Sequence, residues 1–424
     1  MILANSRHRP GLALAVTLAA QMLGSALLAV PSVIAPAVAP TLGLGAERVG
    51  LFVGIAYFAA MVSGLGSGGW VARIGAVGVS QCAMLSFALG TLVAIAAHPL
   101  ALTLAAVLFG VGYGMLNPAS TSLLGHHAPL SNRSLFFSVK QTGVPIGVAL
   151  AGLLMPWALQ AIGWQPSVAV AGALCGALAL ALWPTIARLE PQLAARRRGA
   201  AATATVAQAA TATATATVAA PAASDASYGL MAVLRNRAVL GLSLMSFTFA
   251  FTQLCFITFL VSYLNLALGR SLALAAGILA ATQVVSSAAR IGWGYVADRW
   301  VDPGRLLGAL GLAMGASCIG LALLGESASD ALILFAAMVC AATAMGWNGV
   351  YFAELARHAT QREAATMAGA SQFFTFSGSM VGPVIFAEII RQGGSYSGAY
   401  AAVAALPIVA GAMMLRSHRR ARQT

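Results

Sequence analysis

Residues 292–305 read GWGYVADRWVDPGR; they include the end of one long apolar segment, 272–297, and lead into the next, 306–325. Asp298, Arg299, Asp302 and Arg305 place four charges within this short stretch, whereas the two flanking segments together contain one charged residue, Arg290. A helix of about 20 apolar residues is long enough to cross the hydrocarbon core of a bilayer. The stretch is therefore expected to form a tight turn at a membrane surface, between two transmembrane helices.

The composition of the whole chain supports this interpretation. Hydrophobic residues make up 60% of the 424 residues and charged residues only 8%, whereas soluble domains carry about 25% charged residues. The sequence therefore predicts an all-α integral membrane protein with twelve transmembrane helices. We expect these helices at 11–35, 48–70, 76–97, 100–124, 134–157, 165–184, 238–264, 272–297, 306–325, 331–353, 364–389 and 399–415.

Basic residues are distributed unevenly between the loops. If the N-terminus lies inside the cell, 18 of the 23 basic residues fall on inner segments and only Arg48, Arg270 and Arg391 on outer ones. Inner loops rich in Lys and Arg are the usual determinant of orientation. The protein is therefore predicted to lie in the cell inner membrane, with both termini in the cytoplasm. The net charge of +13 then needs no nucleic-acid partner.

The longest polar interruption, at 185–237, includes a low-complexity tract of alanine and threonine. We interpret 185–237 as a flexible cytoplasmic linker between an N-terminal six-helix bundle, 1–184, and a C-terminal six-helix bundle, 238–424. The two halves share short matches. Asn117 corresponds to Asn348 and Gln141 to Gln372 at a constant offset of 231 residues. Such repeats are typical of transporters and predict two pseudo-symmetric bundles.

The charged stretch at 292–305 resembles the loop that follows helices 2 and 8 in the major facilitator superfamily. The family pattern is Gly-x-x-x-Asp-Arg followed by Gly-Arg, and the matching residues are Gly294, Asp298, Arg299, Gly304 and Arg305. The first copy keeps Arg73 but has Ala72 in place of the aspartate. The resemblance implies a charge network that closes a cytoplasmic gate, with Asp298, Arg299, Arg305 and Arg73 as its candidates. A plain turn at the membrane surface is the alternative.

Two cations lie inside predicted helices. Lys140, the only lysine of the chain, would lie about 9–10 Å deep, and Arg290 about 12 Å from the same surface. Such a charge costs about 2.5–3.5 kcal/mol to insert. None of the ten acidic residues falls in the middle of a predicted helix, so a bound anion is the natural counter-charge. Lys140 could instead extend its side chain back to water, which is less favourable for Arg290 because its helix runs the other way.

The family resemblance places helices 5 and 8 across the interface of the two halves, so Lys140 and Arg290 are expected to face each other across a substrate pathway. Other polar and aromatic side chains on the lining helices are also predicted to bind substrate, although each could instead form a hydrogen bond between packed helices. These residues are Asn117, Gln141, Asn348, Gln372, Gln21, Tyr57 and Trp347. The sequences GVPIG, at 143–147, and GSMVGP, at 378–383, resemble a bend on helix 5 of drug exporters, with close helix packing as the alternative.

The residues favour a secondary transporter of a small organic anion, most simply a carboxylate, that works by alternating access. Proton-coupled uptake is the expected mode, with Lys140 as the candidate proton carrier because a buried lysine, unlike arginine, can lose its proton. The expected partners are the small anion, the proton and the bilayer, and the chain is expected to be a monomer without cofactor or metal. Alternatives are a drug or metabolite exporter and, more remotely, a receptor or scaffold with a transporter fold. An enzyme is disfavoured because no His, Cys or acidic cluster is visible.

Overall fold

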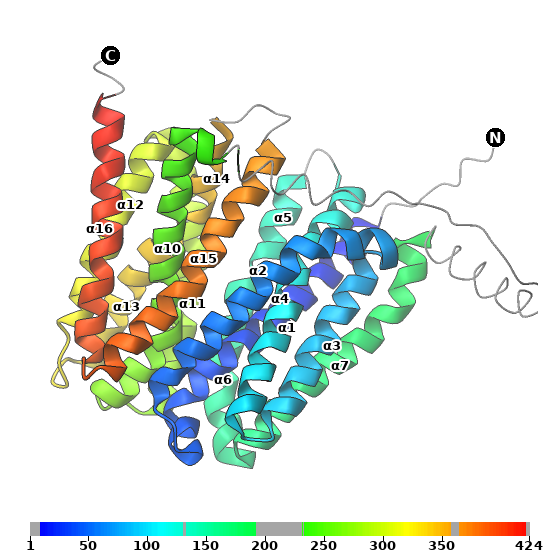
Figure 1. Ribbon diagram of the computed structural model, residues 1–424, viewed down its shortest axis with the longest axis horizontal. Helices are drawn as coiled ribbons and strands as arrows, with labels where there is room; N and C mark the ends of the chain where they lie inside the picture. The colour runs from blue at the N-terminus through cyan, green and yellow to red at the C-terminus, as the bar shows by residue number, and fades with distance from the viewer. Residues whose placement is uncertain (1–8, 130–132, 192–230, 232, 358–363, 421–424) are drawn as a thin grey trace, which may run out of the picture.

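The computed structural model describes residues 9–129, 133–191, 231, 233–357 and 364–420 (Figure 1). Across these ranges the chain forms helices joined by short turns, without a β-strand. Twelve helical spans among the described residues are long and apolar enough to cross a membrane. Each of them overlaps one of the twelve predicted segments, so the predicted all-α membrane fold is confirmed.

The first bundle contains six of these spans, and they are built from seven helices. The helices are α1 (Pro10–Val38), α2 (Val49–Ile74), α3 (Ala76–Ala94), α4 (Pro99–His127), α5 (Arg133–Gln141), α6 (Gly143–Ile162) and α7 (Trp164–Leu189). The short turns η1 (Ala39–Leu42) and η2 (Ala46–Arg48) join α1 to α2. Helices α5 and α6 form one span that is interrupted at Thr142. Pro145 explains this break, because it has no N–H with which to bond the carbonyl of Gln141.

The second bundle repeats this layout. Its helices are α10 (Arg237–Ser262), α11 (Leu272–Arg299), α12 (Pro303–Ala322), α13 (Asp330–Ala344), α14 (Asn348–Arg357), α15 (Ala364–Arg391) and α16 (Tyr396–Arg420), with the π-helical turn η4 (Tyr263–Ala267) after α10. The predicted span at 331–353 is confirmed, but it is interrupted, since Met345–Trp347 separate α13 from α14. Helix α7 also continues to Leu189, beyond the predicted bundle limit at 184. Most of the predicted linker, 185–237, lies outside the described residues.

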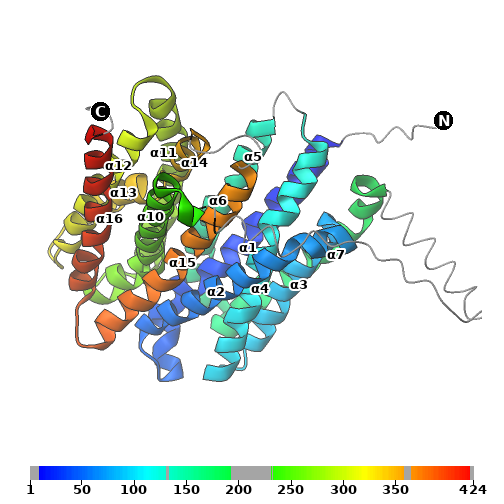
Figure 2. The ribbon, with the colours of Figure 1, turned by 45° about the horizontal axis from the view of Figure 1, so that its top comes forward.

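The two bundles lie side by side (Figures 1 and 2). Helix α2 packs against α15 and α6 packs against α11, and these two pairs form the main contacts between the bundles. In both views α3 and α7 lie at one side of the molecule, and α12 and α16 at the other. The beginning of α1 and the end of α16 lie at the same face, which we call the terminal face; the other is the opposite face.

Glycines allow the bundles to touch toward the opposite face. A Cβ atom on Gly50, at the beginning of α2, would lie only 2.3 Å from the carbonyl oxygen of Pro383 in α15. A Cβ on Gly152 of α6 would lie 2.7 Å from the carbonyl oxygen of Ala276 in α11. Any larger side chain at either position would force the helices apart. The bundles are therefore closed against each other on this side.

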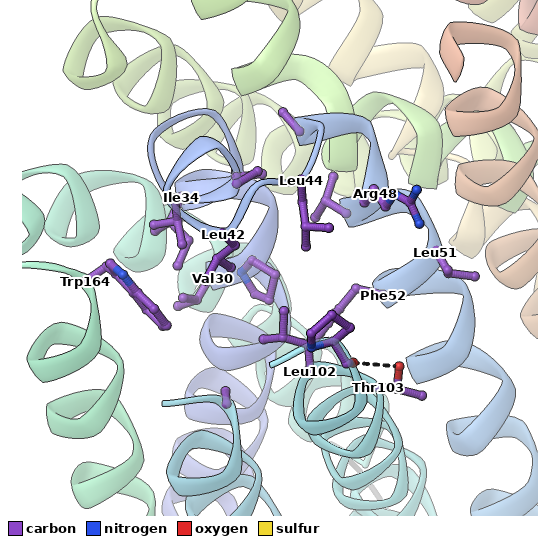
Figure 3. Close-up of a pocket in the computed structure, with 18 of the residues that line it drawn as sticks. Val30, Ile34, Leu42, Leu44, Arg48, Leu51, Phe52, Leu102, Thr103 and Trp164 are labelled. Carbon is purple, nitrogen blue, oxygen red and sulfur yellow. Dashed lines mark hydrogen bonds between the residues drawn. The ribbon is translucent and has the colours of Figure 1, made fainter. Parts of the chain in front are cut away.

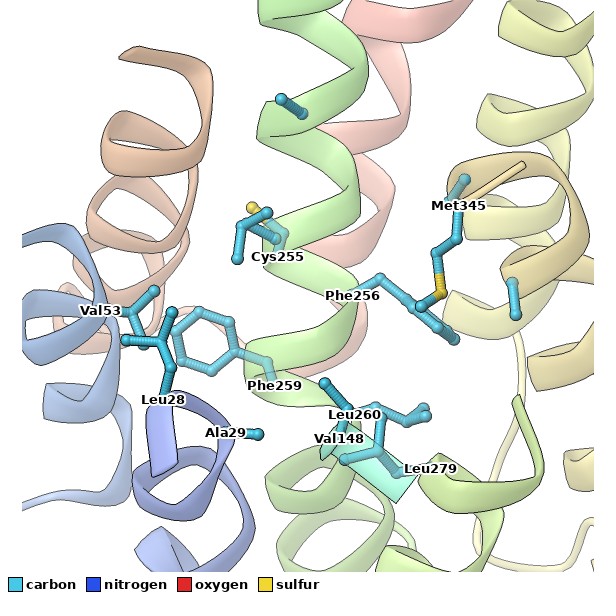
Figure 4. Packing of buried hydrophobic residues seen from close by; sticks show 14 of the residues in the cluster. Leu28, Ala29, Val53, Val148, Cys255, Phe256, Phe259, Leu260, Leu279 and Met345 are labelled. Atoms are coloured by element: carbon cyan, nitrogen blue, oxygen red, sulfur yellow. The ribbon is translucent and has the colours of Figure 1, made fainter. Parts of the chain in front are cut away.

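An apolar cluster fills the same part of the interface (Figure 4). Phe259 of α10 points toward Leu28 of α1 and Val53 of α2. Its ring also stacks on Phe386 of α15, with centroids 4.2 Å apart and an interplanar angle of 14°. Because this layer contains no polar partner for a charged molecule, it forms a barrier between the bundle interior and the opposite face.

The two glycine–proline motifs serve helix packing. A Cβ on Gly147 of α6 would lie 2.2 Å from the carbonyl oxygen of Met22 in α1. On α15, a Cβ on Gly378 would lie 2.1 Å from the carbonyl oxygen of Phe247 in α10. These approaches support the packing interpretation that the sequence left open.

Candidate functional site

Lys140, near the end of α5, is buried, with 3% of its surface exposed. Its Nζ donates to Asn117 Oδ1 on α4, at 2.7 Å, and to Gln141 Oε1, at 3.3 Å. Both acceptors are neutral amides. None of the ion pairs that the described residues form includes Lys140. The side chain thus stays inside the bundle, which does not agree with the alternative that it extends to water.

Arg290, on α11, is half-buried and holds the break in the tenth span. Its Nε donates to the carbonyl oxygen of Met345 at 3.1 Å, and Trp293 Nε1 donates to the carbonyl oxygen of Ala342 at 2.8 Å. The break frees these carbonyls, and the two side chains satisfy them. The terminal nitrogens of Arg290, Nη1 and Nη2, make no hydrogen bond or ion pair with another described residue. They remain available to a ligand.

Tyr113 of α4 faces α1 and α2. Its ring meets Tyr57 of α2, and Leu116, three residues further along α4, would touch a Cβ placed on Gly24 of α1, between Gln21 and Ser25. Arg290 lies within electrostatic range of Tyr113. Asn117, the partner of Lys140, follows Tyr113 by four residues, which places both on one face of α4, about 6 Å apart along the axis. Lys140 thus contacts α4 through Asn117, whereas Arg290 interacts electrostatically with Tyr113, one turn earlier on the same helix. Tyr113 was not among the residues predicted to bind substrate.

Aromatic rings from three helices line the same region. Tyr57 of α2 meets Tyr113 edge to face, with centroids 5.9 Å apart and an interplanar angle of 66°. Phe376 of α15, from the other bundle, lies 6.3 Å from Tyr57. Tyr57 thus joins rings of both bundles, Tyr113 of the first and Phe376 of the second.

The structure gathers only some of the predicted binding residues here. Asn117, Gln141 and Lys140 form one group, and Gln21 and Tyr57 adjoin Tyr113. Trp347 is instead buried, donates to Gln253 Oε1 at 3.0 Å and packs edge to face on Phe249. It acts in packing, so the prediction that it binds substrate directly is not supported. Asn348 and Gln372 are half-buried and make no side-chain hydrogen bond with other described residues.

The charge network at the terminal face differs from the expected one. Asp298 and Arg299 at the end of α11 are exposed, as is Arg73 at the end of α2. No ion pair among the described residues joins Asp298 to Arg299 or to Arg305.

Arg357, at the end of α14, forms the ion pairs instead. It bonds Asp302, and at 3.1 Å it also bonds Glu354, which is 2% exposed. The hydrogen bond that Arg357 donates to Asp302 and the charge of Glu354 raise the pKa of the Arg357 guanidinium. Asp302 in turn caps α12 by accepting the backbone N–H of Gly304. This cluster ties the end of α14 to the beginning of α12.

The first bundle achieves a similar contact with a different residue. Glu190, after the end of α7, accepts the backbone N–H groups of Ala76 and Val77 at 2.6 and 3.2 Å. Both bundles thus place a carboxylate at the N-terminus of the helix that follows the charged loop. In the first bundle that carboxylate comes from a position 114 residues away in the sequence. Glu190 could not be assigned to this contact from the loop sequence alone.

A separate pocket opens between α1, α2, α4 and α7 near the opposite face (Figure 3). It encloses about 210 Å³ and has a largely apolar lining that includes Ile34, Phe52 and Trp164, with Arg48 at its edge. Neither Lys140, Arg290 nor Tyr113 lines it. We therefore place the candidate binding site at the two cations and not in this pocket.

The fold is that of a membrane protein of two related six-helix bundles, with a buried lysine in the first and a half-buried arginine in the second. The family model of the Major Facilitator Superfamily matches residues 13–383, and the chain belongs to that family. The family expected from the charged loop at 292–305 is thereby confirmed. This membership favours transport over catalysis.

Similar proteins include several named transporters. A gallate transporter of Pseudomonas putida is 33% identical over 168 residues, which cover 39% of this chain and 36% of that relative. A hexuronate transporter of Bacillus subtilis (strain 168) is 23% identical over 400 residues, 91% of this chain and 89% of that relative. A 4-hydroxybenzoate transporter of Acinetobacter baylyi is 30% identical over 29% of its length. The chain thus spans about a third of the gallate and 4-hydroxybenzoate relatives that it matches.

Solved structures share the fold. A bacterial homologue of the human lysosomal transporter Spinster, in an inward-facing and unoccupied conformation, superposes with a TM-score of 0.70 at 18% sequence identity. The alignment covers 96% of this chain and 94% of that one. At this identity the likeness concerns the fold alone.

Proposed function

We propose that the protein is a secondary transporter that carries a small organic carboxylate by alternating access. The observation that carries this proposal is that Lys140 is buried against two neutral amides and that the terminal nitrogens of Arg290 are unused, with no carboxylate partner for either cation among the described residues. Buried charges are costly unless they are paired. A bound anion would provide the missing pair, and the planar fork of Arg290 suits the two oxygens of a carboxylate.

The named relatives support the substrate class. Gallate, 4-hydroxybenzoate and hexuronate all carry a carboxylate near neutral pH, and two of them are aromatic. The rings of Tyr57, Tyr113 and Phe376 would pack against an aromatic substrate. A cationic drug would meet two positive charges instead, which counts against the exporter alternative for such compounds.

Proton coupling is the second part of the proposal. Lys140 is protonated while the anion is bound and releases its proton as the empty carrier resets. The proton gradient would then drive uptake toward the terminal face, which we place in the cytoplasm. The closed contacts around Gly50 and Phe259 correspond to a carrier sealed on the outer side.

Uptake into proteoliposomes tests the proposal. Purified protein is reconstituted, an inward proton gradient is imposed, and labelled 4-hydroxybenzoate, benzoate, glucuronate and a cationic control, benzylamine, are offered in turn. We expect accumulation of at least one carboxylate that collapses when a protonophore is added, and none of benzylamine. Accumulation of benzylamine alone would contradict the proposal.

The orientation can be tested with reporter fusions. The excess of arginine on the terminal face predicts that a fusion after Arg197 or Arg420 lies in the cytoplasm. An alkaline phosphatase fusion at either site should be inactive, and a green fluorescent protein fusion should fluoresce. A phosphatase that is active at both sites would reverse the orientation.

The loop charges should separate into a transport role and a stability role. We propose that Asp298 acts in the gate, so Asp298→Asn should reduce uptake while changing the free energy of unfolding by less than about 0.5 kcal/mol.

Arg357→Gln should lower the free energy of unfolding by about 1–3 kcal/mol, because Asp302 and Glu354 lose a shared cation. Uptake assays and thermal unfolding distinguish the two. Full uptake by Asp298→Asn would leave only the plain-turn interpretation.

A further inference from the structure

We propose that Tyr113 and Gln21 form a hydroxyl-recognition subsite, so that the carrier selects aromatic carboxylates with a ring hydroxyl para to the carboxylate. This inference rests on the proposed function and assigns the distal end of the same ligand. It gives Tyr113 a ligand-binding role and Gln21 a positioning role behind it.

The first observation is an unsatisfied buried acceptor. Gln21 is 1% exposed, and its Nε2 donates to Ser25 Oγ at 3.3 Å. Its Oε1 has no hydrogen-bond partner among the described residues. A buried amide oxygen without a donor costs about 1–3 kcal/mol, so a donor in another state of the carrier would stabilise that state.

The second observation is the position of the Tyr113 hydroxyl. Between Gln21 and Ser25 of α1, a Cβ on Gly24 would lie 2.7 Å from Leu116 Cδ1, three residues from Tyr113 on α4. The ring of Tyr113 is half-buried, whereas Gln21 is fully buried. A ligand therefore meets Tyr113 first. When the Tyr113 hydroxyl donates to Gln21 Oε1, its oxygen becomes an acceptor for the ligand. A ligand hydroxyl that donates to Tyr113 completes this chain and satisfies both residues.

Gly143 helps to fix Gln21 in this position. A Cβ atom on Gly143 would lie 3.1 Å from Gln21 Cβ and 3.2 Å from its Cγ. The absence of a side chain at 143 thus leaves the room that the stem of Gln21 occupies between α1 and α6. Because the stem is confined, the amide end has little freedom to turn toward another donor.

The spacing along α4 fits a substituted benzene ring. Asn117, which holds Lys140, and Tyr113 are separated by about 6 Å of helix axis. The carboxylate and the para hydroxyl of a hydroxybenzoate lie at opposite ends of one ring, a length of the same order. With the carboxylate held by Lys140 at the Asn117 end, the ring would lie along Tyr57 and the hydroxyl would reach Tyr113.

Competition binding tests this subsite. Labelled 4-hydroxybenzoate is bound to the purified full-length protein in lipid nanodiscs, and is displaced by unlabelled 4-hydroxybenzoate, benzoate or 4-methoxybenzoate. The last compound retains an acceptor oxygen but cannot donate. The parent is compared with Tyr113→Phe and Gln21→Leu. The control is Gln81→Leu, which loses the hydrogen bond from α3 to the Ala179 carbonyl of α7. Thermal unfolding confirms that each variant is folded.

We expect the parent to bind 4-hydroxybenzoate about tenfold more tightly than benzoate or 4-methoxybenzoate. Tyr113→Phe and Gln21→Leu should each reduce this preference to about twofold or less while the Kd for benzoate changes less than threefold. Gln81→Leu should keep the preference. Equal binding of benzoate and 4-hydroxybenzoate by the parent, or a preference that persists in Tyr113→Phe, would overturn the inference and leave the carboxylate site intact. Failure of the parent to bind any of the three carboxylates would overturn the proposed function as well.

Discussion

Arg290→Gln is expected to weaken carboxylate binding by about 100-fold or more. Truncating one partner of a buried, charge-assisted pair typically costs about 2–5 kcal/mol, and each 1.4 kcal/mol is a factor of ten in Kd. The effect should be large because Arg290 offers the ligand two nitrogens that no other described residue uses, while Nε is occupied by the carbonyl of Met345. Equilibrium binding of 4-hydroxybenzoate to the purified variant measures the loss.

Two further variants separate the ligand contact from general charge and folding effects. Arg290→Lys keeps the charge but loses the planar fork, and should still weaken binding about tenfold or more. Arg188→Gln removes an exposed arginine at the end of α7, outside the binding site, and should bind like the parent. Because Arg290 also holds the break in the tenth span, thermal unfolding must show that Arg290→Gln remains folded. Near-parental affinity in a folded Arg290→Gln protein would remove Arg290 from the site.

Lys140→Arg is expected to separate binding from proton-driven accumulation. Arginine keeps the positive charge beside Asn117 but does not release its proton, so the substrate-bound carrier forms while the empty carrier cannot discharge. Accumulation under an imposed pH gradient should fall to about a tenth of the parental level or less. Exchange of external for internal labelled substrate, which needs no proton release, should persist. Both are measured in the same proteoliposomes.

Lys140→Ala tests whether Lys140 carries the proton at all. Lys140→Ala removes both the charge and its hydrogen bonds to Asn117 and Gln141, so accumulation should be lost. If Lys140→Ala accumulates substrate as well as the parent, the proton must travel on the substrate or on another group. Lys140 would then be a buried structural cation only.

The fold could be predicted almost completely from the sequence, because the bilayer imposes long apolar spans and the arginines mark one face. The breaks could not. Pro145 explains the interruption at Thr142 after the fact, but many membrane helices tolerate proline, so its presence did not require one. The separation of α13 from α14 depends on Trp293 and Arg290, which satisfy the freed carbonyls from another helix. Such tertiary hydrogen bonds leave no periodic signal in the sequence.

The site could be predicted in part. Lys140, Arg290 and Asn117 were identified because charge and amide groups are rare in apolar spans, and rarity is visible in a sequence. Tyr113 was missed because an aromatic residue in a membrane helix is unremarkable until its neighbours are known. Trp347 was expected to bind substrate for its position in a lining helix, yet its indole N–H is used by Gln253.

The ion pairs of Arg357 at the terminal face could not be predicted either. Asp302 and Arg357 are 55 residues apart, and no local pattern joins them.

Equilibrium binding of a matched pair of ligands tests the central claim most directly. Benzoate and benzylamine present the same ring with opposite charge, so the comparison isolates the sign of the field that Lys140 and Arg290 create. The account predicts that the parent protein in nanodiscs binds benzoate and shows no measurable binding of benzylamine, and that Arg290→Gln loses the benzoate. Binding of benzylamine with an affinity equal to or greater than that of benzoate would contradict an anion site between the two bundles.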